Sequence, residues 1–407
     1  MNTPLAKNEL APQPFESELR DNILPFWMQH TLDRENGGFY GAVTNDLRVD
    51  NEIERSAVLC SRILWTFSTA ASLYGDESCL RTARWAFDYL SSHFWDEQNQ
   101  GMYWSLDWRG LPVNDRKHTY AQAFSIYGLA AFYQASGEPK SLALAQNLFR
   151  LIETHTFDPV SGGNIECRAR DWSALADMRL SDKEIDSSMS MNTLLHLMEA
   201  YAALARVWPD ETLVKKLDGL VRVFLEHVID PQTGHQRLFF DHQWNSLSEH
   251  ISYGHDIETS WLLVEAAEVL GDPLLLERVR TIALSMAQVV YDQALQPDGS
   301  ILYEIAPGGQ REENRHWWAH AEAVVGFYNA HQLSGQAHFA RAAGQVWEYI
   351  QAHFVDRQNG DWFKLLNQQG EPDLDHYKVG PWECPYHHAR MCYEMIRRCQ
   401  DKHQVTA

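Results

Sequence analysis

The sequence is poor in positive charge and has no long apolar segment, and each absence excludes a class of protein. It contains 34 Lys and Arg against 55 Asp and Glu, which gives a formal net charge of −21. Nucleic acids and anionic membranes are bound through Lys and Arg, so this balance disfavours both partners. A membrane-spanning helix needs about 18 or more consecutive apolar residues, and no such run is present. A neutral small molecule fits this composition better than a polyanion.

Cysteines are also few, and their spacing indicates neither a disulfide framework nor a metal site. The six cysteines include no C-x-x-C pair, so we expect free, buried thiols in a reducing compartment. The segment 1–15 lacks the apolar core of a signal peptide, and we therefore expect a cytoplasmic protein. No compact histidine motif for zinc and no glycine fingerprint for a nucleotide occurs. We expect no metal and no other cofactor.

A pattern repeated six times organises the chain. Each copy is a polar turn with glycine followed by an aromatic or β-branched run, as in DRENGGFYGAV at 33–43 and DRQNGDWFKLL at 356–366. The marker glycines, spaced by 61 to 72 residues, are Gly37, Gly101, Gly162, Gly234, Gly299 and Gly360. Such a fixed period is typical of one repeat architecture. We predict a single domain over residues 1–407, with 1–14 and 400–407 as flexible tails.

Each unit contains two helical patterns of different character. The first is apolar on several faces, as at 120–137 and 191–208, and the second has one apolar stripe, as at 141–155 and 211–228. Four of the first helices are followed by a glycine, as a helix C-terminus prefers, namely Gly75, Gly137, Gly271 and Gly335. A helix that is apolar all round is buried, whereas a single stripe covers a surface. We predict an all-α (α/α)6 barrel of six helical hairpins, with short β-hairpin loops at one end.

The alternative is an open solenoid of helical pairs, and the chain ends bear on this choice. Neither end shows the polar capping repeat that an open solenoid needs. The helix expected at 385–399 lacks an outer partner in its own repeat, and the helix expected at 15–31 lacks an inner one. Pairing the two completes the sixth hairpin and favours closure.

In a closed barrel the N-terminal ends of the inner helices converge, and polar residues gather at these positions. They are Arg62, Tyr120, Asn192, His196, His255, Glu258, Trp318, Glu322, Trp382, His387 and Arg390. One histidine on a helix is more often a hydrogen-bonded core residue, but three from different repeats around one centre indicate a site. His255 and Glu258 are three residues apart and share a helix face if the helix has begun. A carboxylate there would fix the histidine tautomer and raise its basicity.

Three kinds of chemistry compete for this group. Three histidines could hold zinc, although no compact ligand pair supports it. Glycoside hydrolysis uses two carboxylates, but here the carboxylates lie beside histidines. Removal of a proton next to a carbonyl suits histidine near neutral pH, and two bases on opposite faces allow inversion. The residues favour the third chemistry.

Six segments at these positions carry a family resemblance. They are SRILWTF at 61–67, KHTYAQAFSIYGL at 117–129, SMNTLLHLMEAY at 190–201, SYGHDIETSWLL at 252–263, NRHWWAHAEAVVGF at 314–327 and PYHHAR at 385–390. The chain resembles the N-acylglucosamine 2-epimerase superfamily, and within it the cellobiose 2-epimerases. The resemblance runs from about residue 15 to 400 and implies an (α/α)6 barrel and an isomerase acting on a sugar. We expect a monomer or weak homodimer.

The resemblance also implies a mechanism and a role for each residue. The sugar ring opens, one histidine removes the C2 proton to leave a cis-enediolate, and the other returns a proton to the opposite face. His255 and His387 would be the two acid/bases, with Glu258 orienting His255. His196 would act with Arg62 to stabilise the oxyanion, where fixed donors have most effect. The residues implied to bind substrate are Arg62, Tyr120, Asn192, Glu184, Glu258, Trp318, Glu322, Trp382 and Arg390.

The loop SDKEIDSSM at 181–189 bears on the choice of sugar. The resemblance implies that Glu184 approaches the outer sugar of a disaccharide, although the rest of this loop matches the family loosely. We expect interconversion of glucose and mannose at the reducing end of β-1,4-linked disaccharides such as cellobiose and lactose. The alternatives are a monosaccharide mannose/glucose 2-epimerase or aldose–ketose isomerase and, second, a glycoside hydrolase of the same barrel fold.

Overall fold

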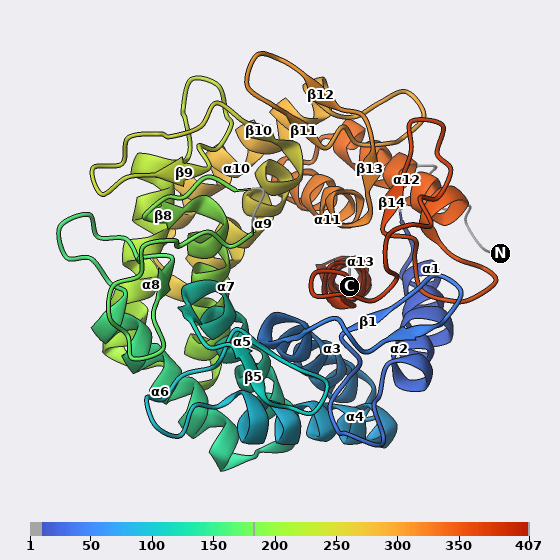
Figure 1. Ribbon diagram of the computed structural model, residues 1–407. Helices are drawn as coiled ribbons and strands as arrows, with labels where there is room; N and C mark the ends of the chain where they lie inside the picture. The colour runs from blue at the N-terminus through green and yellow to red at the C-terminus, as the bar shows by residue number, and fades with distance from the viewer. Residues whose placement is uncertain (1–9, 182–183, 406–407) are drawn as a thin grey trace.

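A computed structural model describes residues 10–181 and 184–405, and its inner helices form a closed ring (Figure 1). The inner helices are α3 (Ala57–Tyr74), α5 (Thr119–Ser136), α7 (Met191–Val207), α9 (Tyr253–Leu270), α11 (Trp317–Ser334) and α13 (Tyr386–Val405). Each packs against the next, and α13 contacts both α11 and α3. The six-hairpin barrel and its closure are confirmed.

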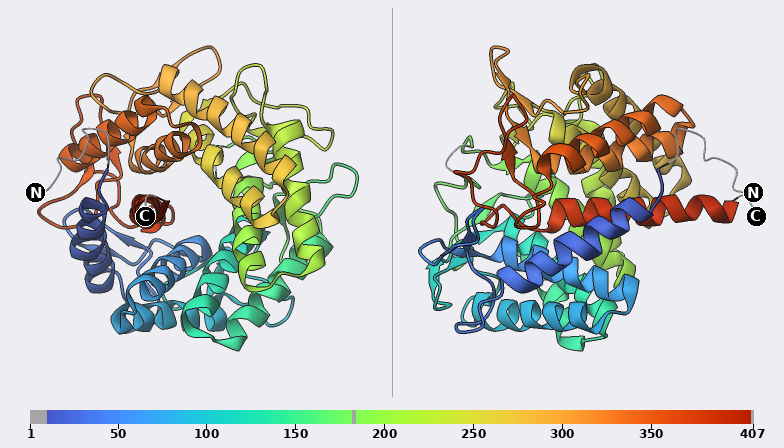
Figure 2. Two further views of the ribbon diagram at one scale, coloured as in Figure 1. Left: turned by 180° about the vertical axis from the view of Figure 1, so that it is seen from behind. Right: turned by 90° about the vertical axis from the view of Figure 1, so that its right-hand side faces the viewer.

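The outer helices surround this ring. They are α4 (Glu77–Tyr89), α6 (Pro139–His155), α8 (Glu211–Val223), α10 (Pro273–Gln293) and α12 (Ala337–Tyr349). The sixth is built from α1 (Gln13–Ser17), the π-helical segment η1 (Glu18–Ile23) and α2 (Leu24–His30). Three others continue into π-helical turns, η2 (Leu90–Phe94), η3 (Phe224–Val228) and η4 (Ile350–Phe354). The N-terminal helix lies beside α13, as predicted from the chain ends (Figure 2).

Short antiparallel strands tie neighbouring repeats together at the end where the inner helices begin. The strands are β1 (Ala42–Val43), β2 (Val49–Asp50), β3 (Arg55–Ser56), β4 (Ser105–Leu106), β5 (Pro112–Asn114), β6 (Lys117–His118), β7 (Cys167–Arg168), β8 (Met189–Ser190), β9 (Phe239–Phe240), β10 (Ile251–Ser252), β11 (Glu304–Ile305), β12 (Arg311–Glu312), β13 (Arg315–His316) and β14 (Leu365–Leu366). Their sheets are β1-β2, β3-β4-β5, β6-β7, β8-β9, β10-β11-β12 and β13-β14. The strand before an inner helix thus pairs with the strand of the next repeat, in register Arg55 with Leu106 and His118 with Cys167.

Local chemistry fixes where the inner helices start and stop. Ser56 and Ser190 cap α3 and α7, each accepting a backbone N–H with its hydroxyl oxygen, as N-cap serines do. The glycines predicted to end four inner helices all adopt the left-handed conformation, with φ between 64° and 71°. A side chain at Gly128 would lie 2.6 Å from the carbonyl oxygen of Ser61, so this glycine permits the close approach of α5 to α3.

The helices extend further toward both ends of the chain than expected. Residues 1–9 and 406–407, within the predicted tails, lie outside the described residues, but α1 begins at Gln13 and α13 continues to Val405. All six cysteines are buried thiols and none of them forms a disulfide bond, as the sequence predicts. Among the described residues, no helix is both long and apolar enough to cross a bilayer.

Candidate active site

A cavity of about 460 Å³ opens where the inner helices begin. Ten of the twelve residues proposed from the sequence line it, namely Arg62, Tyr120, Glu184, Asn192, His196, His255, Glu258, Trp318, Trp382 and His387. The other two, Glu322 and Arg390, are buried and are not among the residues found to line the cavity. Glu322 contacts His387, and Arg390 contacts Glu322. The structure therefore separates residues that can touch a ligand from residues that hold them.

His387 stands in the first turn of α13 with its ring nearly buried. Its Nδ1 lies 2.7 Å from Oε1 of Glu322. Because an ionised carboxylate only accepts hydrogen bonds, Nδ1 carries the proton and Nε2 is left with its lone pair. Burial lowers the pKa of His387 well below its usual value, and Arg62 and Arg390 lower it further. His387 is therefore a neutral base at physiological pH.

His255 lies in the first turn of α9 and has a different partner. Its Nδ1 is 2.7 Å from the hydroxyl oxygen of Ser252. Burial lowers the pKa of His255 to about 3, and His196 contributes in the same direction. This histidine is also neutral near pH 7, and it is held by a hydroxyl instead of a carboxylate.

The expected pairing of Glu258 with His255 is wrong. Oε1 of Glu258 accepts a hydrogen bond from Nη2 of Arg390 at 2.5 Å, and it lies 4.0 Å from Nδ1 of His387. The helix has begun at Tyr253, as the prediction required, but a buried guanidinium is a stronger partner for a carboxylate than a neutral imidazole. Glu258 therefore points toward Arg390 and His387 on α13.

Trp318 forms a wall that both histidines share. Its ring centroid lies 4.8 Å from that of His255 and 5.4 Å from that of His387. The indole contacts both imidazoles and remains partly exposed to the cavity. It packs against both proposed bases and offers an apolar face to a ligand.

The opposite side of the cavity carries fixed hydrogen-bond donors. Nη2 of Arg62 donates to the hydroxyl of Tyr120 at 2.9 Å, and its guanidinium carbon lies 4.1 Å from the centroid of the Phe124 ring. His196 contacts Tyr120 edge to face, with centroids 5.2 Å apart. A positive charge held away from water can stabilise an oxyanion that develops beside it.

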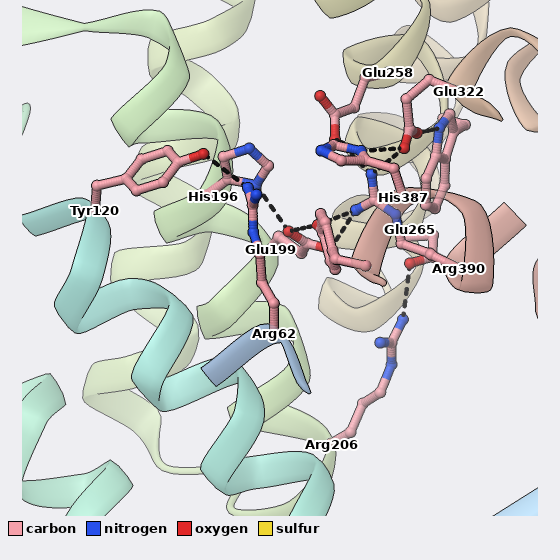
Figure 3. A network of polar contacts seen from close by, with 12 residues as sticks. Arg62, Tyr120, His196, Glu199, Arg206, Glu258, Glu265, Glu322, His387 and Arg390 are labelled. Atoms are coloured by element: carbon pink, nitrogen blue, oxygen red, sulfur yellow. Dashed lines mark hydrogen bonds and ion pairs between the residues drawn. The ribbon is translucent and has the colours of Figure 1, made fainter. Parts of the chain in front are cut away.

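Arg390 joins the carboxylates behind the cavity (Figure 3). Its Nη1 lies 2.6 Å from Oε1 of Glu199, and its Nη2 lies 2.7 Å from Oε1 of Glu322. Burial and the charge of Glu322 raise the pKa of Glu258 to about 7, against the opposing effect of Arg390. Ligand atoms of Glu258, Glu322 and His387 lie within 4.8 Å of one another, as a metal site would require. The guanidinium of Arg390 already places a positive charge against the carboxylates of Glu258 and Glu322.

Glu184 and Asn192 connect the cavity to a second one of about 540 Å³. Both residues line both cavities, and so do His255 and Tyr303. Burial raises the pKa of Glu184 to about 7. Oδ1 of Asn192 is buried without a hydrogen-bond partner among the described residues. Residues 182 and 183 of the loop predicted to meet an outer sugar lie outside the described part of the chain.

Sequence reasoning missed several residues of this site. Glu199 and Ser252 hold the Nδ1 atoms of His196 and His255, and each lies three residues from its histidine. That spacing, which drew attention to Glu258, could have found them. Glu383, which follows Trp382, also lines the cavity. The sequence around Glu383 did not indicate this position, because a loop lacks the regular repeat from which the direction of a side chain can be predicted.

Comparison with known proteins agrees with this geometry. The family model described as N-acylglucosamine 2-epimerase matches residues 38–390. The chain is 42% identical over 390 residues to a cellobiose 2-epimerase of Bacteroides fragilis, covering 96% of this chain and 99% of the relative. It is 38% identical over 385 residues to a cellobiose 2-epimerase of Ruminococcus albus, covering 94% and 98%.

Solved structures show the same relationship. The structure of the cellobiose 2-epimerase from Bacillus thermoamylovorans superposes with a TM-score of 0.91 at 37% identity, covering 95% of this chain and 99% of the other. The family model spans most of the chain, and the match with the solved structure extends to almost all of it. The chain belongs to the N-acylglucosamine 2-epimerase family.

Proposed function

We propose that this protein is a sugar 2-epimerase that interconverts glucose and mannose at the reducing end of β-1,4-linked disaccharides such as cellobiose. The observation that carries the proposal is the pair His255 and His387. Both are neutral imidazoles that line one cavity, and each has its Nδ1 held in a hydrogen bond. The names of the relatives, cellobiose 2-epimerases at up to 42% identity, support the same activity.

The geometry suits proton transfer at a carbon next to a carbonyl. After ring opening, Nε2 of one histidine takes the C2 proton, and the electron pair moves through C1 to the aldehyde oxygen to give a cis-enediolate. Arg62 and His196 stabilise the negative charge on that oxygen. C2 of the enediolate is planar and its bond to C1 is double, so both of its faces can be protonated. The other histidine, carrying on Nε2 a proton taken from solvent, protonates C2 on the opposite face, and the first histidine releases its proton to solvent. Because both histidines have lowered pKa values, each is available as a base near neutral pH.

The size and shape of the site support a disaccharide. The first cavity holds the histidines, and the second adjoins it through Glu184 and Asn192. The reducing-end sugar fits the first cavity, which leaves the second for the outer sugar. Carboxylate and amide groups at the junction suit the hydroxyls of both rings.

Incubation with cellobiose in D₂O tests the proposal. We expect the product with mannose at its reducing end, carrying deuterium at C2, as measured by NMR and mass spectrometry. Product without deuterium at C2 would exclude a mechanism in which the proton that returns to C2 comes from solvent. Release of free glucose would instead support the hydrolase alternative, and turnover of mannose but not of cellobiose would support the monosaccharide alternative.

A further inference from the structure

Glu199 is a buried carboxylate that contacts His196, Arg390 and Tyr386, and among the described residues it does not line the cavity. Its Oε2 lies 2.9 Å from Nδ1 of His196. Its Oε1 accepts from Nη1 of Arg390 at 2.6 Å, and the hydroxyl of Tyr386 lies 2.6 Å from both carboxylate oxygens. A group placed in this way can act on the reaction only through the residues that it holds.

The first of these residues is His196. Glu199 follows it by three positions on α7, one turn further from the cavity. Burial alone would raise the pKa of Glu199, but Arg390, His196 and Tyr386 together lower it to about 2. The carboxylate is therefore ionised and accepts the Nδ1 proton, which leaves Nε2 of His196 as the ring nitrogen that faces a ligand.

The second connection runs through Arg390 to the base His387. One guanidinium nitrogen bonds Glu199 and the other bonds Glu322, which in turn holds Nδ1 of His387. Arg390 bonds three carboxylates, Glu199 through Nη1 and both Glu258 and Glu322 through Nη2. Removing the charge of Glu199 therefore changes the field on the other two. Inside a protein, where screening is weak, such charges act on one another strongly.

We propose that Glu199 is a positioning residue that orients His196 directly and His387 through Arg390 and Glu322. The inference rests on the proposed epimerase function, because it assigns both histidines a part in that reaction. Loss of the carboxylate would leave the cavity wall in place but would free the ring of His196 and unbalance Arg390. The expected effect is therefore on turnover more than on substrate binding.

The chain offers a matched control in Glu153. This carboxylate also accepts a tyrosine hydroxyl, that of Tyr201 at 2.7 Å, and pairs with a cation, Nζ of Lys216 at 2.6 Å. It lies on the outer helix α6 and does not line the cavity. Glu153→Gln removes a comparable charge from a comparable network away from the reaction.

The experiment compares Glu199→Gln, Glu199→Asp and Glu153→Gln with the wild type, using cellobiose epimerisation, the pH profile of kcat and the thermal midpoint. We expect Glu199→Gln to lower kcat by about tenfold or more with KM changed by less than about threefold, and to shift the pH profile. Glu199→Asp, which restores the charge, should recover part of kcat and return the profile toward wild type. Glu153→Gln should keep both wild-type values.

Two results would overturn the inference. One is a Glu199→Gln enzyme with wild-type kcat and pH profile. The other is a loss of kcat in Glu199→Gln that Glu153→Gln reproduces at the same drop in thermal midpoint. If Glu199→Gln does not fold, Glu199→Asp decides, because wild-type kcat and pH profile after the carboxylate has moved by one methylene would contradict a positioning role. Failure of the wild type to epimerise cellobiose would refute the proposed function, whereas wild-type turnover with an insensitive Glu199 refutes only this inference.

Discussion

Nδ1 of His387 lies 2.7 Å from a carboxylate oxygen of Glu322, whereas Nδ1 of His255 lies 2.7 Å from the hydroxyl oxygen of Ser252. The two proposed bases therefore differ in what holds them. A carboxylate partner stabilises the protonated form of a histidine more than a hydroxyl does. At His387, burial, Arg62 and Arg390 act against this effect of Glu322 by lowering the pKa. The two bases are therefore held in different electrostatic surroundings, and the two directions of the reaction need not be equally sensitive to changes at each base.

Replacing Glu322 by Gln tests the carboxylate behind His387. The amide keeps the shape of the side chain but removes the charge, so kcat should fall by about tenfold or more, with little change in KM because Glu322 does not line the described cavity. Ser252→Ala is the matching change behind His255 and should have the smaller effect on kcat. Equal losses in the two variants would contradict the asymmetry of the bases.

Removing either base should stop epimerisation but not all proton exchange. In His255→Ala or His387→Ala, the remaining histidine can still remove and return a proton on its own face of C2. We expect epimerisation to fall by at least about a hundredfold, while one of the two epimers exchanges its C2 hydrogen with D₂O without inversion. NMR of each pure epimer measures this, and each variant should label a different epimer. Ordinary epimerisation rates in either variant would remove that residue from the pair.

Gly254 leaves the space that the indole of Trp318 occupies. A Cβ added at Gly254 would lie 2.7 Å from the Trp318 ring and 3.0 Å from Cβ of Ala319, so Gly254→Ala should displace the indole that packs against both His255 and His387. We expect kcat to fall by about tenfold, as measured with cellobiose. Gly219→Ala in α8 meets no atom within 4 Å and should leave kcat unchanged. Unaltered kcat in Gly254→Ala would show that the spacing of the histidines tolerates this shift.

The sequence predicted the architecture well because the fold repeats itself. Two patterns depend only on nearby residues: the spacing of the marker glycines, and the contrast between the helices at 120–137 and 141–155. The structure shows the glycines in turns with positive φ and both helices in place. The positions of His255 and His387 on one cavity followed from their place at helix starts. The partner of Glu258 did not follow, because i,i+3 spacing gives a shared face but does not show that Arg390 enters from a distant helix.

Buried histidines should make folding stability sensitive to acid. His320 has both ring nitrogens engaged, Nε2 accepting from the N–H of Ile301 and Nδ1 donating to the carbonyl of His316. Burial lowers its pKa from 6.5 to about 3, so between these values the unfolded chain binds a proton that the folded chain does not. Stability that is present above pH 6.5 is thus lost as pH falls toward 3. Urea unfolding at a series of pH values should show this loss in the wild type and a smaller slope in His320→Gln, even though that variant is less stable at neutral pH. Identical slopes would exclude His320 as a source of the acid sensitivity.

Glu184 provides a test of the second cavity. It stands where the two cavities meet, half-buried, with a pKa raised by burial to about 7. If the outer sugar occupies the second cavity, Glu184→Ala should raise KM for cellobiose by about tenfold, since a hydrogen bond to a charged group contributes about 1.5 kcal/mol or more. Activity on mannose should change far less, because a monosaccharide beside the histidines leaves the second cavity empty. Exposed Glu77 lies on α4 at an N-terminus away from the cavity, and Glu77→Ala is the control for loss of a single carboxylate. An equal loss on both sugars would place Glu184 at the reacting ring, and the second cavity would then no longer support a disaccharide over a monosaccharide.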